Sequence, residues 1–402
     1  MLQKSGSGSN ISTIFKSPAF VTLWLSEGFS MIGDRLLMVA IISLVYDRTG
    51  SAGVVGLLMV FKAVPALLLG TLAGVFVDRW NRKWIMVLSN LVQGVLVFLL
   101  PVATDIAYIF TIYLAMSTIN QFFVPARSAV IPDMVPAGAL LTANSLFAVF
   151  IVFAIALGPA AGAWIMENYG LTAAFQIDAA TFLVPAAAVS LLSIPGKPWN
   201  GREKTSLSSD LKAGLAFSLS HPSVLATLLT ITAAFLIVGT MSVSGVVLVT
   251  VVLGLESGQF GYLMSGLGAG MLIGALITNC VKQWISGVMA GIIGTVIMAF
   301  ALILLPTCSS LREASLAAMV IGVGMITVQI NGQMLLQIIA PDMRGRLMGI
   351  SQTLTGSANF FASAAAGLLL EKLTVSSVMW MAAALALTAA AVAGFLHRKT
   401  VQ

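Results

Sequence analysis

Long apolar segments separated by short polar stretches run along the whole chain. A helix of about 20 apolar residues crosses the roughly 30 Å hydrocarbon core of a bilayer, and windows of that length predict twelve helices. Their approximate ranges are 19–46, 52–77, 83–102, 106–127, 140–166, 171–194, 222–248, 256–280, 285–307, 314–338, 345–370 and 374–396. The apolar runs are continuous and do not alternate residue by residue, which excludes a β-barrel. The pattern therefore predicts an all-α integral membrane protein.

The long polar stretch from Gly196 to His221 separates the sixth predicted helix from the seventh. We therefore expect an N-terminal six-helix bundle over 1–195, a cytoplasmic linker over 196–221 and a C-terminal six-helix bundle over 222–402.

Two short motifs recur in the two predicted bundles. Gly53-x-x-Gly56-x-Leu-Met in the second helix matches Gly258-x-x-Gly261-x-Leu-Met in the eighth, 205 residues later. A Pro-Asp-Met sequence at 132–134, before the fifth helix, recurs 209 residues later, before the eleventh. Both matches join one helix with the sixth helix after it, which is the pattern that two parallel six-helix repeats predict.

Composition and charge agree with a membrane protein. Hydrophobic residues make up 59% of the 402 residues and charged residues only 8%, with a mean hydropathy of +1.03, whereas about a quarter of the residues in a soluble domain are charged. Residues 1–18 are polar and the first apolar segment is too long for a signal peptide, so we expect none. Cys280 and Cys308 lie in apolar segments, where free thiols are expected.

The placement of Lys and Arg predicts the orientation in the membrane. With a cytoplasmic N-terminus, fifteen of the twenty fall on the cytoplasmic side, and only Arg48, Arg312 and Lys372 fall outside. Since cytoplasmic loops carry an excess of Lys and Arg, both termini are expected in the cytoplasm. The net charge of +6 reflects this topology, so we expect no binding of nucleic acid.

Charged residues inside the predicted helices are the first candidates for function. Glu27 and Asp34 are seven residues apart, so they share one face of the first helix, and Arg35 follows directly. Helical rise places Asp34 roughly 20 Å from the cytoplasmic end and Lys62 roughly 15 Å from the outer end of the second helix, which predicts that these two meet. Because a carboxylate in hydrocarbon costs several kcal/mol, a cavity is expected around them. Either Glu27 or Asp34 exchanges a proton with this cavity, or a static pair of Asp34 with Lys62 or Arg35 fixes helix packing.

Other polar residues in the apolar segments are weaker candidates. Asp178 in the sixth helix either lines the cavity or forms an interfacial hydrogen bond. Gln329, Asn331 and Gln333 in the tenth helix either bind an amphiphilic substrate or join helices through hydrogen bonds. The sequence contains no nucleotide-binding loop, catalytic triad or metal-ligand cluster. We therefore expect neither an enzyme nor a metal site, and no cofactor beyond a proton gradient.

The connection between the second and third helices carries the motif Gly74-Val-Phe-Val-Asp78-Arg79-Trp-Asn81-Arg82-Lys83. It resembles G-x-x-x-D-R-x-G-R-K/R, the signature of the major facilitator superfamily. Asn81 replaces the family's Gly, and Asn is the next best residue for the left-handed backbone expected in this turn. The resemblance implies the major facilitator fold, with Asp78 and Arg82 locking the cytoplasmic side. We assign Arg79, Lys83 and Arg127 to the same cytoplasmic gate.

The fifth helix carries a second motif, Ala154-Ile-Ala-Leu-Gly158-Pro159-Ala-Ala-Gly162-Ala163. It resembles the antiporter motif G-x-x-x-G-P-x-x-G-G of the same superfamily, with Ala at both ends. The resemblance implies export rather than uptake. The alternative is an ordinary small-residue face for helix packing, since small residues four apart let helices approach closely.

Further segments resemble the macrolide-efflux and enterobactin-exporter branch of the superfamily. They are Gly33-Asp34, Val124-Pro-Ala-Arg127, Ile131-Pro-Asp-Met-Val-Pro136 and Pro341-Asp-Met-Arg-Gly-Arg346. This resemblance implies a monomeric secondary active exporter of a drug or siderophore-like compound, working by proton antiport and alternating access. Three alternatives stay open: a divalent metal exporter of the ferroportin type, which the Gly33-Asp34-Arg35 run also resembles, a lysophospholipid flippase, and a membrane scaffold that transports nothing.

Overall fold

The computed structural model describes residues 14–103, 105–136, 139–192, 215–281, 285–339 and 343–401. Across these ranges the regular secondary structure is helical, and no strand occurs in them. The first helices are α2 (Pro18–Thr49), α3 (Ala52–Arg79), α4 (Arg82–Leu99), α5 (Ile106–Met134) and α6 (Leu140–Leu191). The later ones are α8 (Pro222–Val247), α9 (Phe260–Val281), α10 (Gly287–Leu304), α11 (Leu311–Ile338), α12 (Arg344–Leu370) and α13 (Val375–Val401).

Element α6 contains two helices, because its backbone leaves the helical region at Gly170. This residue has a φ of 82°, which glycine adopts readily and other residues adopt at a cost. With α6 counted as two, the described part of the chain forms twelve long helices. Ten of the elements are long and apolar enough to cross a membrane. The prediction of an all-α, multi-pass membrane protein is therefore confirmed.

Short helical turns extend several of the long helices. They are η1 (Leu100–Val102), η3 (Leu248–Val252), η4 (Ser257–Gln259) and η5 (Leu305–Thr307).

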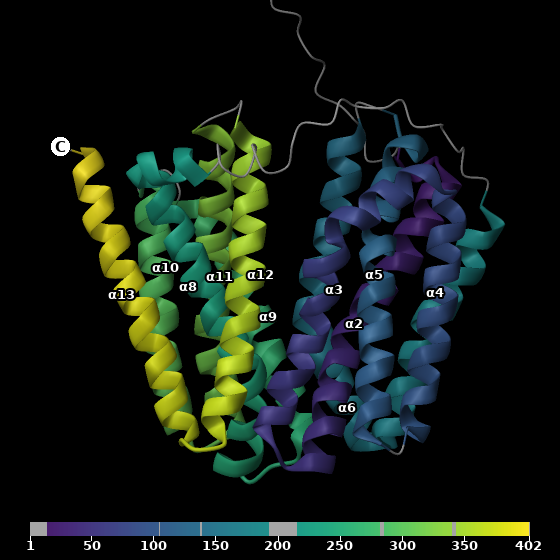
Figure 1. Cartoon of the computed structure of the whole chain (residues 1–402), viewed down its shortest axis with the longest axis horizontal. Helices are drawn as coiled ribbons and strands as arrows, with labels where there is room; N and C mark the ends of the chain where they lie inside the picture. Colours follow the sequence, from purple (N-terminus) through teal and green to yellow (C-terminus); the bar gives the residue numbers. More distant parts are fainter. Residues whose placement is uncertain are drawn as a thin grey trace, which may run out of the picture.

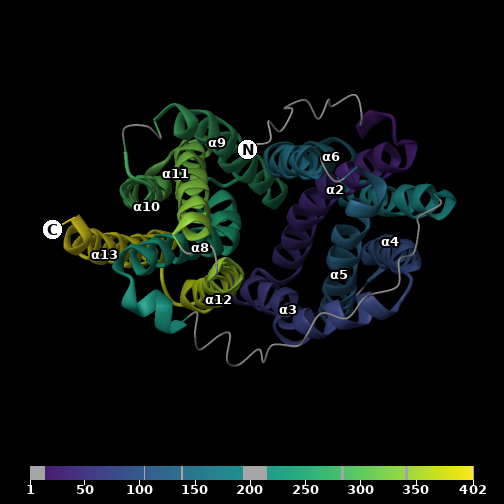
Figure 2. The same cartoon turned by 90° about the horizontal axis from the view of Figure 1, so that it is seen from above.

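Helices α2–α6 and α8–α13 form two groups that lie side by side (Figures 1 and 2). We call them the N-terminal half and the C-terminal half. They come together at one end of the molecule and separate toward the other, where α2 begins and α13 ends (Figure 1). Residues 193–214, which contain most of the predicted linker, lie outside the described residues, so the linker boundaries stay a prediction.

Glycines allow the two halves to touch at the end away from α13's last residue. A Cβ added to Gly56 of α3 would lie 3.0 Å from the Cα of Gly367 in α12. A Cβ added to Gly261 of α9 would lie 2.2 Å from the carbonyl oxygen of Pro159 in α6. Contacts this close leave no room for a side chain. The backbone of α3 therefore lies directly against that of α12, and the backbone of α9 lies against that of α6.

The turn between α3 and α4 differs from its prediction. Asn81 has a φ of −69°, not the positive φ that we expected. It is the N-cap of α4, and its side-chain oxygen accepts hydrogen bonds from the backbone N–H groups of Lys83 (3.0 Å) and Trp84 (3.4 Å). Asn is among the residues preferred at this position because its side chain satisfies free N–H groups at a helix start. The residue thus serves as a cap rather than as a glycine substitute.

The end of α5 is also different from its prediction. The helix continues to Met134, past Pro125 and Pro132, whereas the sequence suggested an end near residue 127. Each proline removes one backbone hydrogen bond. Val130, Ile131 and Met134 are nevertheless buried in an apolar cluster with residues of the neighbouring helices, which keeps this segment helical. The Pro132-Asp133-Met134 motif therefore forms the end of α5 and, as predicted, precedes the next helix, α6.

Candidate functional site

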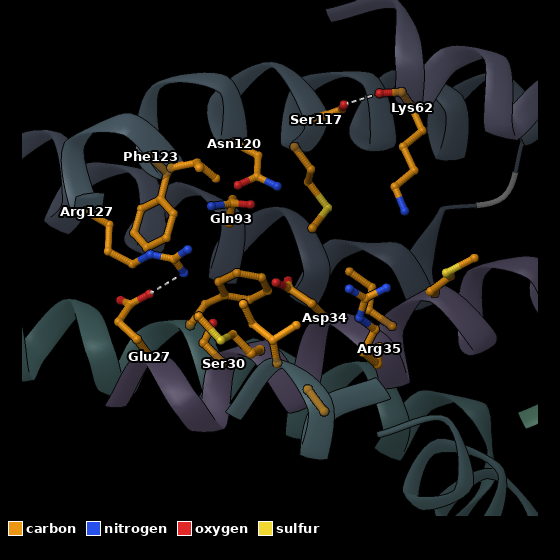
Figure 3. A pocket seen from close by; sticks show the side chains of 18 of the residues that line it. Glu27, Ser30, Asp34, Arg35, Lys62, Gln93, Ser117, Asn120, Phe123 and Arg127 are labelled. Carbon is orange, nitrogen blue, oxygen red and sulfur yellow. Dashed lines mark hydrogen bonds and ion pairs between the residues drawn. The ribbon is translucent and has the colours of Figure 1, made fainter. Parts of the chain in front are cut away.

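A cavity of about 380 Å³ lies inside the N-terminal half, and α2 forms one of its walls (Figure 3). All of its lining residues fall between Glu27 and Phe182, so α2, α3, α4, α5 and α6 supply them. Its polar lining consists of Glu27, Ser30, Asp34, Arg35, Lys62, Gln93, Ser117, Asn120 and Arg127. The cavity thus contains the four charged residues of α2 and α3 that the sequence singled out, together with Arg127.

Glycines on α2 determine which way its carboxylates point. A Cβ on Gly28 would lie 2.5 Å from the ring of Phe150, and one on Gly33 would lie 2.3 Å from Asp178 Oδ1. Both neighbours belong to α6, so this glycine face of α2 packs directly against α6. Glu27 and Asp34 lie on another face of α2, and that face lines the cavity.

One end of the cavity holds a buried ion pair. Only 1% of Glu27 is exposed, and its Oε2 lies 3.9 Å from Nη1 of Arg127. Its other oxygen accepts a hydrogen bond of 3.3 Å from Asn90. The Arg127 guanidinium also lies over the rings of Phe123 (5.8 Å) and Phe147 (5.7 Å). Glu27 is therefore held in place with its charge compensated.

Arg127 was assigned to the cytoplasmic gate, but it lines the cavity. The cause is the end of α5: because the helix continues to Met134, Arg127 lies almost two turns inside it. Neither Asn90 nor the Glu27–Arg127 pair was predicted from the sequence.

Asp34 lies in the middle of the cavity, opposite Gln93 and Asn120 (Figure 3). Its side chain is exposed to the cavity, as is that of Lys62. The predicted pair is not formed: within the described residues, Asp34 makes no ion pair closer than 4.0 Å and no side-chain hydrogen bond. Both groups can be hydrated where they are, so neither needs the other as a partner.

Arg35 and Lys62 lie at the far end of the cavity from Glu27 (Figure 3). The backbone carbonyl of Lys62 accepts a hydrogen bond from the Ser117 hydroxyl, which ties α3 to α5 beside the cavity. The charges are therefore spread along the cavity. The ion-paired carboxylate of Glu27 lies at one end, the carboxylate of Asp34 lies in the middle, and the cations Arg35 and Lys62 lie at the other end.

Asp178 is not part of the cavity lining. It is fully buried behind α2, where its Oδ1 accepts a hydrogen bond of 3.1 Å from the Thr181 hydroxyl. Its second oxygen has no hydrogen-bond partner among the described residues. Of the two roles that the sequence left open, Asp178 does not line this cavity, and the hydrogen bond it accepts comes from its own helix, α6.

The polar residues of α11 are also away from the cavity. Asn331 is 6% exposed, donates a hydrogen bond of 2.8 Å to the carbonyl of Thr327 and packs near Gly287 of α10. Gln329 and Gln333 are half-buried and do not line the cavity either. In this conformation, the expected contribution of the C-terminal half to the cavity is absent among the residues described.

The predicted cytoplasmic gate is described only in part. Gly74, Asp78 and Arg79 belong to α3 by their backbone, but the side chains of Asp78 and Arg79 lie outside the described part of the chain. Arg82 Nη1 lies 3.6 Å from Oδ2 of Asp133 and donates to the carbonyl of Ala129, which joins α4 to the last turns of α5.

Lys83 lies over the ring of Trp84, 5.6 Å from its centroid. Asp133, in contrast, was not among the predicted site residues. The recurring Pro-Asp-Met motif was the signal that could have identified it.

The predicted antiporter motif contacts two helices. A Cβ on Gly158 would lie 2.7 Å from the carbonyl oxygen of Ile32, and one on Gly162 would lie 3.2 Å from Leu36, both in α2. Pro159 faces Gly261 of α9 in the other half. The motif therefore lies between the cavity-lining α2 and the C-terminal half.

Comparison with known proteins identifies the family. The model of the Major Facilitator Superfamily matches residues 23–363. This chain belongs to the major facilitator superfamily. The twelve long helices of the described residues and the multi-pass architecture are those expected of a facilitator, and the resemblance inferred from the motifs is confirmed.

Several bacterial facilitators are similar in sequence. The uncharacterized MFS-type transporter YfiS of Bacillus subtilis is 27% identical over 368 residues, covering 89% of this chain and 88% of YfiS. Macrolide efflux protein A of Streptococcus pyogenes is 26% identical over 181 residues, 44% of this chain and 45% of that protein. The multidrug efflux pump Tap of Mycobacterium tuberculosis is 26% identical over 237 residues, 55% and 56% of the two chains.

Solved transporter structures share the fold. The nucleoside transporter NupG aligns with a TM-score of 0.73 at 14% identity, covering 94% of this chain and 99% of NupG. A bacterial homolog of the human lysosomal transporter Spinster, in an inward-facing and unoccupied conformation, aligns with a TM-score of 0.70 at 14% identity over 95% of both chains. These structures show the fold, and membership of the superfamily identifies the protein as a transporter.

Proposed function

We propose that this transporter is a secondary active exporter that exchanges protons for an organic amine by alternating access. It works as a monomer in a bacterial inner membrane with both termini in the cytoplasm, and it uses a proton gradient rather than a cofactor. Two relatives are named as a macrolide efflux protein and a multidrug efflux pump, which supports export of organic compounds.

The observation that carries the proposal is the environment of Asp34. It is a carboxylate in the middle of a membrane-spanning helix, exposed to a cavity and without a partner among the described side chains. An ionisable group inside a membrane is costly and usually marks a pathway for protons, ions or substrate. Glu27 is different, because Arg127 and Asn90 already engage both of its oxygens. Asp34 is therefore the carboxylate free to bind either a proton or a cation.

The cavity lining supports an organic amine with an apolar part as the substrate. Met31, Met38, Met116 and Phe123 supply an adaptable apolar surface. A volume of about 380 Å³ is near the lower end of the roughly 300–1,000 Å³ typical of small-molecule sites. A basic amine on the substrate would bind Asp34, while Arg35 and Lys62 would donate hydrogen bonds to oxygen atoms elsewhere on the same molecule. The substrate and the proton then compete for one carboxylate, which couples their movements.

Transport into inverted membrane vesicles tests this proposal. Inverted vesicles with an acidic interior should accumulate a labelled macrolide amine, and dissipating the pH gradient should abolish the accumulation. Asp34→Asn should remove the dependence on the gradient. Asp105→Asn is the matched control, since Asp105 is an exposed carboxylate at the start of α5 whose side chain caps nothing. Gradient-driven accumulation that survives Asp34→Asn would contradict the proposal.

A further inference from the structure

The recurring glycine motifs lie at equivalent places in the two halves. Gly53 and Gly56 begin α3 and pack on the end of α12, near Glu371 and Gly367. Gly258 and Gly261, 205 residues later, lie at the start of α9 and pack on the first helix of α6, near Met166 and Pro159. The repeat therefore produces two related contacts between the halves. We call this end of the molecule, where the four glycines lie, the closed end.

A glutamate accompanies each of these contacts. Glu371 directly follows α12, and Glu167, 204 residues earlier, lies near the end of the first helix of α6. Both accept hydrogen bonds from the opposite half. Gly53 N–H (2.9 Å) and the Ser51 hydroxyl donate to Oε1 of Glu371, and the Tyr262 hydroxyl of α9 donates to Oε2 of Glu167 (2.9 Å). The two carboxylates thus occupy related positions and make related bonds.

Glu371 acts as a helix cap supplied by the other half. The first N–H groups of a helix have no partner within it, and Gly53 is the second residue of α3. A carboxylate is favourable at this place because the start of a helix carries partial positive charge. Ser51, the N-cap residue of α3, adds its hydroxyl to the same oxygen. Two hydrogen bonds therefore depend on one carboxylate that the C-terminal half brings to α3.

Two further observations agree with this role. A Cβ on Gly53 would lie 2.9 Å from Oε1 of Glu371, so glycine at this position leaves space for the carboxylate. The hydrogen bonds from Ser51 and Gly53 also lower the pKa of Glu371 below its usual value, which keeps it ionised. Both glutamates are exposed to solvent, so water can replace these bonds when the halves separate.

We propose that Glu371 is a positioning residue of the transport cycle, which binds the start of α3 only while the closed end is shut, and that Glu167 does the same for α9 through Tyr262. Every opening of this end breaks both sets of bonds, so they set the balance between the two conformations. The inference rests on the proposed function only through its alternating-access step. It does not depend on the substrate, the proton or the direction of transport.

Distance measurements between spin labels across the closed end test this proposal. Labels at Asp105→Cys and Arg312→Cys, in a Cys280→Ser/Cys308→Ser background, report on the two halves from exposed positions. The measurement is made on the full-length protein without substrate or gradient. Loss of a hydrogen-bonded carboxylate in Glu371→Gln should raise the ratio of open to shut molecules on the order of tenfold. Ser51→Ala, which removes one donor, should raise it less, and Glu167→Gln should also raise it.

The matched control is Glu256→Gln. Glu256 is exposed at the same end, and its side chain forms no hydrogen bond with another residue of the described part of the chain. The control should leave the distances unchanged, and thermal unfolding should show that all variants are folded. The proposal is overturned if folded Glu371→Gln keeps the parent distances, or if Glu256→Gln shifts them equally. A protein that shows the expected shift but exports no amine would refute the proposed function and leave this inference intact.

Discussion

Arg127 offers a quantitative test of how the cavity is held together. The structure predicts that Arg127→Met destabilises the protein much more than Glu27→Gln, although both changes break the same ion pair. The reason is burial: 1% of the Glu27 side chain is exposed, against 18% of Arg127. Without Arg127, the Glu27 charge is buried with only the Asn90 hydrogen bond to compensate it. Without Glu27, Arg127 can still reach water.

The expected magnitudes follow from this geometry. Removing one partner of a buried ion pair costs about 3–5 kcal/mol. We use the lower value, because the two charged atoms are 3.9 Å apart and Arg127 is partly exposed. Loss of the contacts with the rings of Phe123 and Phe147 adds about 1 kcal/mol, so Arg127→Met should cost about 4 kcal/mol. Glu27→Gln should cost about 1 kcal/mol, the usual value of one hydrogen bond.

The assay is equilibrium unfolding in mixed micelles by titration with a denaturing detergent. The double variant Glu27→Gln/Arg127→Met should be more stable than Arg127→Met alone, because it contains no unpaired buried charge. If Glu27→Gln costs as much as Arg127→Met, or if the two single changes simply add in the double variant, then the pair does not hold α2 against α5 and the reasoning is wrong.

Three further predictions use the same methods. Asn81→Ala should lose about 1 kcal/mol of stability, and Asn81→Gly should lose only a few tenths of a kcal/mol. If Asn81→Gly instead raises the stability, residue 81 adopts a left-handed turn and does not act as a helix cap. Gly33→Ala should lower the unfolding temperature, since its Cβ would lie 2.3 Å from Asp178 Oδ1, and an unchanged temperature would contradict the packing of α2 on α6. Hydrogen bonds lower the pKa of Glu371 from 4.5, so its contribution to the shut state should be present above pH 4.5 and be lost as the pH falls through the lowered pKa. Spin-label distances measured against pH test this. If the parent protein begins to open already at neutral pH and Glu371→Gln does not, the prediction is contradicted.

The helices could be predicted from the sequence because hydrophobic length is a strong and local signal. The errors arose where a local rule competed with packing. The apolar window predicted that α5 ends near residue 127, but burial of its last turns keeps it helical to Met134. Asn81 was interpreted through its backbone tolerance, although its side chain provides the cap.

The cavity could be predicted only in part. The spacing of Glu27 and Asp34 correctly indicated one face of α2, because helical periodicity fixes it. Their partners could not be derived, since nearly every face of these helices is apolar and periodicity does not reveal which faces meet. Arg127 was consequently misplaced, and Asp34 was given a partner, Lys62, that it does not contact.

The central claim is that a proton and an organic amine compete for Asp34. The most direct measurement is the number of protons released to a weakly buffered solution when a macrolide amine binds to the solubilised protein, over a range of pH values. We predict net proton release on binding for the parent protein, for Glu27→Gln and for the control Asp105→Asn, and none for Asp34→Asn. Equal proton release from Asp34→Asn and from the parent protein would contradict the claim.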